Sequence, residues 1–377
     1  MSRLTVVQAL PALNTGGVER GTLEVAAELV KRGHRSIVVS AGGELLEELI
    51  QTGSEHILLP VGKKSPLTLK YIFPLRTALL QNNTSILHAR SRLPAWISYL
   101  AWRGMANSKR PRFVTSVHGP YSVNAYSKIM MSGERVIAVS DFIHNYIVEN
   151  YPEIVTEKIV TIERGVSSQK YPYAYQPDPA WLERWYRQYP QLVNKRLITL
   201  PARLTRWKGQ EDFLRILAKL SDRKLPIHGL IVGGSHPRKQ QYGEELLTLS
   251  KKLGLSDLVT FTGHRSDLKE IMSVSAIVLS LSGEPEAFGR TVLESLCLGT
   301  PVIAYAHGGA AEIMNRMFPV GLVNKHDLDA VTRLIIDFLE NKQTVLANNP
   351  FSLQRMLDQT INLYEQLNAA PRGNWPT

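Results

Sequence analysis

Two glutamates, Glu286 and Glu294, stand eight residues apart in the segment Glu284–Ala304. At the rise of a helix this spacing separates them by roughly 12 Å. Carboxylate pairs that cleave glycosidic bonds lie closer together, at roughly 5 to 9.5 Å. The spacing therefore favours two contacts at opposite ends of one elongated ligand. The alternative is that Glu286 is a surface loop charge and Glu294 a solvated helix residue.

A second set of candidates is cationic and follows a predicted strand at 197–200. Arg203 and Lys208 lie five residues apart in the loop between this strand and a helix. Arginine offers a planar fork of donors and lysine a point charge, so the two can converge on a diphosphate. The alternative is a pair of solvated cations on a basic protein.

Three of the glycine pairs, Gly16-Gly17, Gly233-Gly234 and Gly308-Gly309, are candidates for ligand-binding loops. Such pairs let the backbone approach a ligand, and before a helix they leave N–H groups free for an anion. The first pair does not fit Gly-x-Gly-x-x-Gly, so it does not predict a dinucleotide site. His118 ends the predicted strand 113–117 and is expected to face the ligand side, with capping or packing as the alternative.

The elements that must position these residues alternate between strands and helices in both halves of the sequence. A strand at Leu4–Leu10 leads into an amphipathic helix at Val18–Arg32, which Gly33 stops. Further strands are expected at 36–41, 56–61, 86–89, 113–117, 136–139 and 159–162, and then at 197–200, 227–232, 259–261, 276–281 and 301–305. This pattern predicts an α/β fold with doubly wound parallel sheets.

The length supports two domains, because 377 residues exceed one ordinary core. We expect an N-terminal domain over 1–172 and a C-terminal domain over 173–354. The segment 171–194, rich in Pro, Tyr and Gln, reads as the linker. A final helix is expected within 351–367, where glycine and proline are absent.

The composition, with 44% hydrophobic and 20% charged residues, is that of a globular protein. No apolar run reaches the eighteen or so residues that span a bilayer. The N-terminal residues lack the three-part layout of a signal peptide. The single cysteine, Cys297, excludes an intramolecular disulfide and fits a reducing cytoplasm, which is the expected location.

The net charge of +11 calls for a polyanionic partner or surface. Residues 1–190 hold 22 Lys and Arg against 15 Asp and Glu, so this half carries +7 and the remainder +4. An anionic membrane surface or a phosphorylated glycolipid would fit. Nucleic acid is not expected, because the sequence shows no zinc finger, RNA-binding aromatic signature or basic helical repeat.

Together these motifs resemble the donor-binding signature of retaining GT-B glycosyltransferases of family 4. The Glu-x7-Glu spacing carries Phe288-Gly289 after its first glutamate, and Leu298–Ala304 matches the usual continuation. Arg-Leu-x-x-x-Lys-Gly, at 203–209, matches the phosphate-binding pair of the family. The resemblance implies a GT-B fold: two Rossmann-like domains facing across a cleft, with a last helix at about 355–370 that crosses back to the N-terminal domain.

The resemblance also implies roles for individual residues. The catalytic set would be His118, Arg203, Lys208 and Glu286. The donor-binding set would be Gly16, Gly17, Gly233, Gly234, His264, Arg265, Phe288, Gly289, Arg290 and Glu294. Glu286 would accept hydrogen bonds from sugar hydroxyls and Glu294 from the ribose, while His264 and Arg265 lie near the base by position only.

One position departs from the family pattern. Glu163-Arg164 stands before Gly165-Val166, where the family usually has Pro-Asn. An asparagine that tolerates a left-handed turn is thus exchanged for a bulky cation. Arg164 is either a local specialisation or only a hinge residue.

The implied reaction is retaining transfer of a hexose-type sugar from a nucleotide sugar, with a UDP-sugar favoured, to a glycan or glycolipid acceptor. Lipopolysaccharide core or another surface polysaccharide is the expected product, with peripheral docking on the cytoplasmic face of an anionic inner membrane. We expect no cofactor and no metal, because no Asp-x-Asp metal motif lies beside the predicted site residues and the cationic pair can neutralise the diphosphate.

Two alternatives remain. A GT-B sugar-nucleotide epimerase would act without an acceptor, so product analysis in its absence distinguishes it. A non-catalytic nucleotide-sugar-binding protein would neither hydrolyse nor transfer its ligand. The presence of Arg203, Lys208, Glu286 and Glu294 argues against the second.

Overall fold

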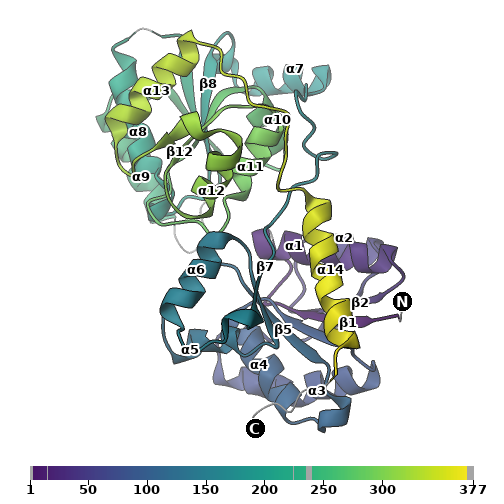
Figure 1. Ribbon diagram of the computed structural model, residues 1–377. Helices are drawn as coiled ribbons and strands as arrows, with labels where there is room; N and C mark the ends of the chain where they lie inside the picture. The colour runs from purple at the N-terminus through teal and green to yellow at the C-terminus, as the bar shows by residue number, and fades with distance from the viewer. Residues whose placement is uncertain (1–2, 15, 224, 235–239, 372–377) are drawn as a thin grey trace. The chain divides into compact units, whose positions relative to one another are not determined.

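The chain folds into two compact α/β units in a computed structural model that describes residues 3–14, 16–223, 225–234 and 240–371 (Figure 1). Unit 1 comprises Met1–Gly165 and Leu353–Thr377, and unit 2 comprises Val166–Ser352. Each unit is built on one parallel sheet with helices on both faces. The expected α/β class with two doubly wound sheets is therefore confirmed.

The described part of unit 1 contains a seven-stranded sheet in the order β3-β2-β1-β4-β5-β6-β7. Its strands are β1 (Thr5–Ala9), β2 (Arg35–Ser40), β3 (Glu55–Leu58), β4 (Ile86–Ala89), β5 (Arg112–Val117), β6 (Arg135–Ala138) and β7 (Ile159–Thr161). Every pair is parallel. The order reverses between β1 and β4, so the carboxyl ends beside this switch point are where such sheets bind ligands.

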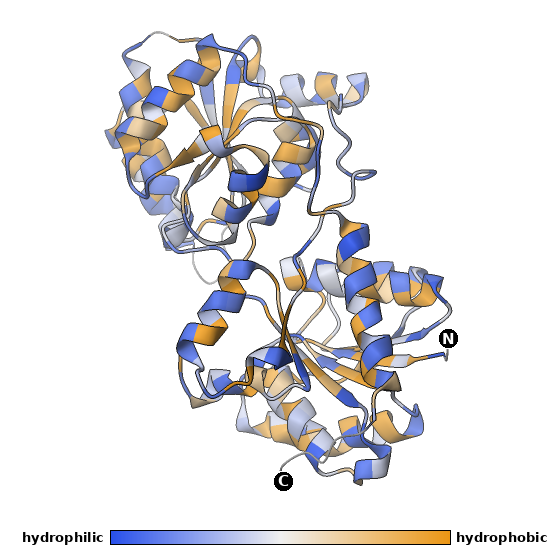
Figure 2. Cartoon of the chain, viewed as in Figure 1, coloured by the Kyte–Doolittle hydropathy of each residue, from blue (hydrophilic) through white to orange (hydrophobic). Residues whose placement is uncertain are grey.

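Helices cover both faces of this sheet: α1 (Gly17–Lys31), α2 (Leu46–Gln51), α3 (Ile72–Gln81), α4 (Arg92–Arg103), α5 (Ala125–Lys128), α6 (Asp141–Asn150) and α14 (Leu353–Ala369). A short 3-10 helix, η1 (Pro66–Tyr71), leads into α3. The inner strands are apolar and largely buried on both faces, whereas the edge strand β3 is partly exposed. Figure 2 shows hydrophobic residues concentrated on the strands and on the helix faces turned toward them.

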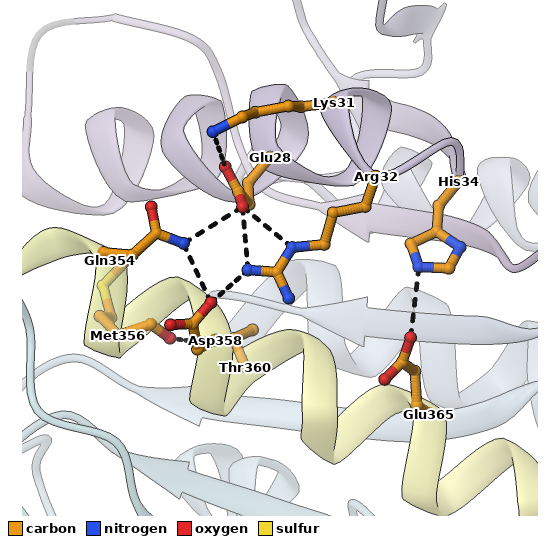
Figure 3. Close-up of polar contacts among 9 residues, drawn as sticks. All are labelled: Glu28, Lys31, Arg32, His34, Gln354, Met356, Asp358, Thr360 and Glu365. Atoms are coloured by element: carbon orange, nitrogen blue, oxygen red, sulfur yellow. Dashed lines mark hydrogen bonds and ion pairs between the residues drawn. The ribbon is translucent and has the colours of Figure 1, made fainter. Parts of the chain in front are cut away.

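The last helix, α14, belongs to unit 1 although it follows unit 2 in the chain, as the resemblance implied. Its residues Ile361 and Tyr364 are fully buried in a cluster with Val25 and Leu29 of α1. Polar contacts flank this apolar seam, and Figure 3 shows them. They are Arg32 to Asp358, Arg32 to Glu28 at 2.9 Å, Gln354 to Asp358 at 2.9 Å and His34 to Glu365 at 3.5 Å.

The described part of unit 2 contains a six-stranded sheet in the order β10-β9-β8-β11-β12-β13. The strands are β8 (Arg196–Pro201), β9 (Ile227–Val232), β10 (Val259–Gly263), β11 (Ser275–Ser280), β12 (Val302–Tyr305) and β13 (Leu322–Val323). The helices are α7 (Pro179–Gln188), α8 (Gln210–Ser221), α9 (Gln241–Lys252), α10 (Leu268–Ser273), α11 (Arg290–Cys297), α12 (Gly308–Met317) and α13 (Leu328–Glu340). All strand pairs are parallel here too.

The segment expected to be a linker is largely packed onto unit 2. Helix α7 buries Trp185 against Leu197 of β8 and Leu230 of β9. The Trp185 ring also stacks on Trp181, with ring centroids 5.3 Å apart.

Within the described residues, no helix combines the length and apolarity that crossing a membrane would require.

Candidate functional site

Four loops of unit 2 carry predicted site residues, and each follows the carboxyl end of a strand. Arg203 and Lys208 follow β8, Gly233-Gly234 follows β9, and His264-Arg265 follows β10. The loop after β11 contains Glu286 and leads to α11. Because the strands are parallel and adjacent, these loops share one edge of the sheet.

A polar cluster in these loops joins Lys208, Glu286 and Ser282. Lys208 Nζ lies 2.7 Å from Glu286 Oε1, and Ser282 Oγ donates to the same oxygen at 2.6 Å. The Lys208 and Glu286 side chains are only 16% and 22% exposed. They line a pocket together with Ser282, Thr291 and the ends of β8 and β11.

This cluster keeps Glu286 ionised. Burial opposes its charge, but the ammonium group of Lys208, the hydroxyl of Ser282 and the nearby His307 together lower the pKa of Glu286 below its ordinary value. The negative carboxylate of Glu286 thus lies beside the positive ammonium group of Lys208. A ligand with hydroxyl groups and phosphates can engage both.

Backbone contacts hold the loop after β11 in place. Gly283 N–H donates to the Trp207 carbonyl at 2.6 Å, and Gly309 N–H donates to the Glu286 carbonyl at 2.8 Å. His307 Nε2 lies 2.7 Å from the carbonyl oxygen of Ser282. The Lys208 ammonium group lies 4.2 Å from the centroid of the Trp207 ring. The loops after β8, β11 and β12 therefore support one another.

Two glycines allow the starts of α11 and α12 to approach closely. Gly289 has a φ of 89°, a left-handed conformation, at the N-cap of α11, and no described side chain caps this helix. A Cβ on Gly289 would lie 2.8 Å from Ala310 Cα, and a Cβ on Gly309 would overlap with Phe288. Thr291 and Val292 of the first turn of α11 line the same pocket as Lys208, so an anion there would lie at the start of this helix.

Arg290 and Glu294, one turn apart on α11, bind each other. Arg290 Nε donates to Glu294 Oε1 at 2.9 Å, and Glu294 is 8% exposed. Glu294 is thus a buried, paired carboxylate and not a solvated helix residue. Its contact with a ribose stays a prediction.

The loops after β8, β9 and β10 also lie against one another. Leu204 N–H donates to the Gly234 carbonyl at 3.1 Å, and a Cβ on Gly233 would overlap with the Ala202 carbonyl. A Cβ on Gly234 would lie 3.4 Å from His264 Cβ. Arg203 is exposed, and its guanidinium has no hydrogen bond or ion pair with any residue that the structure describes.

Arg265 is committed to a structural contact. Its Nε and Nη2 donate to the two carboxylate oxygens of Asp267 at 2.8 and 2.6 Å. Trp181 Nε1 donates to the same carboxylate at 2.8 Å, and the Arg265 guanidinium lies over the Trp185 ring. The Trp181 contact fixes α7 on the sheet, and the sequence did not reveal it because Trp181 and Asp267 are 86 residues apart along the chain. A base contact by Arg265 or His264 stays a prediction.

The predicted residues of unit 1 lie at the carboxyl edge of its own sheet. Gly16 and Gly17 open α1, where Gly16 is the N-cap and accepts a bond from Arg20 N–H at 3.0 Å. His118 directly follows β5, and its Nδ1 lies 3.1 Å from Arg164 Nη2. Burial, followed by the charges of Arg164 and Arg90, holds the pKa of His118 well below its ordinary value.

His118 lines a cavity together with residues that sequence reasoning missed. Arg90 follows β4 and is 3% exposed. His88 lies in β4, where its Nε2 contacts Ser116 Oγ and its Nδ1 contacts Tyr364 of α14, both at 2.6 Å. The position of Arg90 after a strand was a usable signal, but the contribution of α14 could not be foreseen.

Among the residues that the structure describes, no group of three or more His, Cys, Asp or Glu side chains could hold a metal ion.

Comparison with known families accounts for nearly the whole chain. Residues 183–350 match the family described as Glycosyl transferases group 1, and residues 15–170 match Glycosyltransferase Family 4. The crystal structure of a glycosyltransferase from Rickettsia africae superposes with a TM-score of 0.85 and 32% identity, over 98% of this chain and 100% of that one. The chain is a member of the group 1, family 4 glycosyltransferases.

Further similarities fit this membership. A structure of Anabaena HepE in complex with UDP and glucose superposes on this glycosyltransferase with a TM-score of 0.81 at 20% identity, over 97% of this chain and 100% of that one. It supports the GT-B fold alone. D-inositol 3-phosphate glycosyltransferase of Corynebacterium jeikeium is 30% identical over 49% of this chain and 47% of its own length. The chain spans about half the length of the first curated relatives it matches.

Proposed function

We propose that this glycosyltransferase moves a hexose-type sugar from a nucleotide-sugar donor to a glycan or glycolipid acceptor, with retention of the anomeric configuration. The observation that carries the proposal is the Lys208–Glu286–Ser282 cluster at the carboxyl ends of β8 and β11. Next to it, α11 begins without a described side-chain cap. One ligand that carries both a diphosphate and sugar hydroxyls suits such a set of groups.

The reaction breaks the bond between the anomeric carbon and the diphosphate oxygen, and forms a bond from that carbon to an acceptor hydroxyl. Negative charge develops on the leaving diphosphate. Lys208, the exposed Arg203 and the first N–H groups of α11 would stabilise it without a metal ion. As Lys208 turns to the phosphate, Glu286 becomes free to accept hydrogen bonds from sugar hydroxyls.

Retention follows in this proposal from front-face attack. The acceptor hydroxyl would approach on the side that the diphosphate leaves, and the departing phosphate would take its proton. His118 would orient the sugar and not act as the base, because its lowered pKa makes its imidazole a weak proton acceptor. The anomeric proton of the product, read by its NMR coupling constant, should show the configuration of the donor.

The donor test is saturation-transfer NMR with UDP-, GDP- and ADP-glucose. UDP-glucose comes first, because a protein of the same fold is known with UDP and glucose. Lys208→Ala should weaken donor binding at least about tenfold, as expected for the loss of a charge-assisted contact. Arg206→Ala is the matched control, since Arg206 lies in the same loop and pairs with Glu245 at 2.6 Å.

Equal donor binding by the wild type and Lys208→Ala would refute this site. A product that forms without any acceptor and differs from the donor only in sugar configuration would point to an epimerase instead. Binding without transfer to any glycan or glycolipid would favour a non-catalytic role.

We propose that the acceptor, a lipopolysaccharide core or another surface polysaccharide, lies at an anionic membrane surface to which unit 1 binds. Large apolar side chains of unit 1 are exposed where η1 runs into α3: Leu67, Leu69 and Phe73 are 74%, 52% and 68% exposed. Exposed Lys63, Lys64 and Lys70 flank them. Apolar side chains beside lysines suit a lipid surface that is negatively charged.

Sedimentation with vesicles tests this surface. Phosphatidylglycerol vesicles should retain the protein at low salt, and phosphatidylcholine vesicles should retain it far less. A Leu67→Ser, Phe73→Ser double variant should bind several-fold more weakly, whereas Val155→Ser, another exposed apolar residue of unit 1, should have little effect. Binding that persists unchanged in high salt would contradict the electrostatic part.

A further inference from the structure

A cavity inside unit 1 is lined by cationic and neutral hydrogen-bond donors. It lies at the carboxyl ends of β4 to β7 and under α1 and α14. The polar residues that line it are His88, Arg90, Ser116, His118, Arg164 and Thr360. Among the described residues that line it there is no carboxylate. Glu24 acts electrostatically on Arg90, but from outside this lining.

We propose that this cavity binds a compact oxyanion, a carboxylate or a phosphate group, between Arg90, Arg164 and His118. Assigning the oxyanion to a sugar substrate rests on the proposed glycosyl transfer. The site itself rests on the geometry of unit 1 alone.

The first argument is the hydrogen bonding of His118. Arg164 is always protonated, so its Nη2 must donate to His118 Nδ1, which lies 3.1 Å away. The neutral imidazole therefore carries its proton on Nε2. This Nε2 is buried and has no hydrogen-bond partner among the described residues. A buried donor of this kind calls for an acceptor.

The second argument is Arg90. The residue is 3% exposed, and its Nε is also a buried donor without a described partner. Burial lowers the pKa of this guanidinium, while its contact with Tyr364 raises it. A buried guanidinium that meets a phenol but no carboxylate in its cavity is electrostatically incomplete. An oxyanion would supply both the charge and the acceptor.

The third argument is the way α1 accommodates Arg164. A Cβ on Gly21 of α1 would overlap with Nη1 of Arg164. The guanidinium thus rests directly on the backbone of α1, where an alanine would displace it. Arg164 also stands where the family resemblance implies asparagine. The cation and the space for it therefore occur together, as an oxyanion site requires.

Two variants test the site without relying on charge removal alone. Arg164→Asn removes the cation. Gly21→Ala keeps every charge and moves the guanidinium, and alanine is favourable within a helix. Arg103→Gln is the matched control, because Arg103 is an exposed cation of unit 1 that does not line the cavity. Circular dichroism confirms that each variant is folded.

The readout is the NMR signal of His118 in the full chain labelled with ¹³C on histidine, assigned with His118→Gln. Inorganic phosphate and, separately, acetate are titrated in the presence of UDP, which keeps phosphate from the diphosphate-binding residues of unit 2. We expect saturable shifts of the His118 signal, at least about tenfold weaker binding in Arg164→Asn, and a smaller loss in Gly21→Ala. Tighter binding of acetate than of phosphate identifies a carboxylate, and the reverse identifies a phosphate.

The proposal is overturned if neither anion shifts the His118 signal, or if both variants bind as tightly as the wild type and Arg103→Gln. The UDP in the same samples separates this outcome from failure of the proposed function. Where UDP binds and His118 does not respond, only the oxyanion site fails. Where His118 responds and UDP does not bind, the donor proposal fails and the oxyanion site stands.

Discussion

At the scale of single residues, both glutamates of the candidate site form ion pairs. Glu286 shares its Oε1 with Lys208 and Ser282, whereas Glu294 is held by Arg290. The first pair joins two loops, and the second lies within one helix. Ligand binding can therefore exchange the partners of Glu286 more readily than those of Glu294, whose carboxylate is more deeply buried.

Glu286→Gln tests how much this pair contributes to stability. The amide can still accept from Ser282, but Lys208 loses its counter-charge in a partly buried place. We expect the unfolding free energy of unit 2 to fall by about 1–2 kcal/mol, since screening by solvent moderates the loss of a buried pair. Denaturant titration measures it. Glu245→Gln, which breaks the exposed pair with Arg206, should change stability by less than about 0.5 kcal/mol, and equal losses would contradict the account.

The sequence alone revealed part of this residue chemistry. Lys208 and Glu286 were predictable because both follow strands whose carboxyl ends share an edge. The structural role of Asp267 was not predictable, because its hydrogen bond with Trp181, which holds α7 on the sheet, depends on how α7 packs. Arg90 and His88 were missed for a similar reason, since their partner Tyr364 lies on a helix that returns from the far end of the chain.

At the scale of elements, strand and helix positions followed closely from the sequence. The strand expected at Leu4–Leu10 is β1 at Thr5–Ala9, and the helix expected at Val18–Arg32 is α1 at Gly17–Lys31. These elements were predictable because the spacing of apolar residues and the glycines that end an element are local features of the sequence. The close approach of α11 and α12 was not predictable. It depends on Gly289 and Gly309, where a side chain would collide with residues about twenty positions away in the sequence.

Gly309→Ala tests this close approach. The new Cβ would overlap with the backbone of Phe288 and would force the starts of α11 and α12 apart. We expect a loss of about 1–3 kcal/mol in the stability of unit 2 and weaker donor binding, because overpacking against backbone cannot relax by a rotamer change. Gly17→Ala is the control: its Cβ would meet nothing within 4 Å, so stability should hardly change. A Gly309→Ala protein with normal melting and donor affinity would refute the requirement.

At the scale of the whole molecule, buried histidines couple both units to pH. Burial, followed by the charges of Arg90 and Arg164, holds the pKa of His88 well below its ordinary value, as it does for His118 in the same unit. In unit 2, burial lowers the pKa of His228 to about 4. Each of these histidines is therefore neutral in the folded protein at a pH where the unfolded chain binds a proton.

Acidification below about pH 6.5 should therefore destabilise the protein before the carboxylates with a lowered pKa, such as Glu286 and Glu28, are protonated. Between the unfolded and folded pKa values the unfolded state binds more protons, so stability rises with pH, by up to about 1.4 kcal/mol per pH unit for each histidine. The carboxylates act later: the lowered pKa of Glu286 and Glu28 gives stability that is present above about pH 4.5 and is lost below it. Guanidinium titrations at pH 5.0 to 7.5 measure the slope. His228→Gln should flatten the slope of unit 2 by about 1 kcal/mol per pH unit while that of unit 1 stays the same, and an unchanged slope in unit 2 would show that His228 titrates normally in the fold.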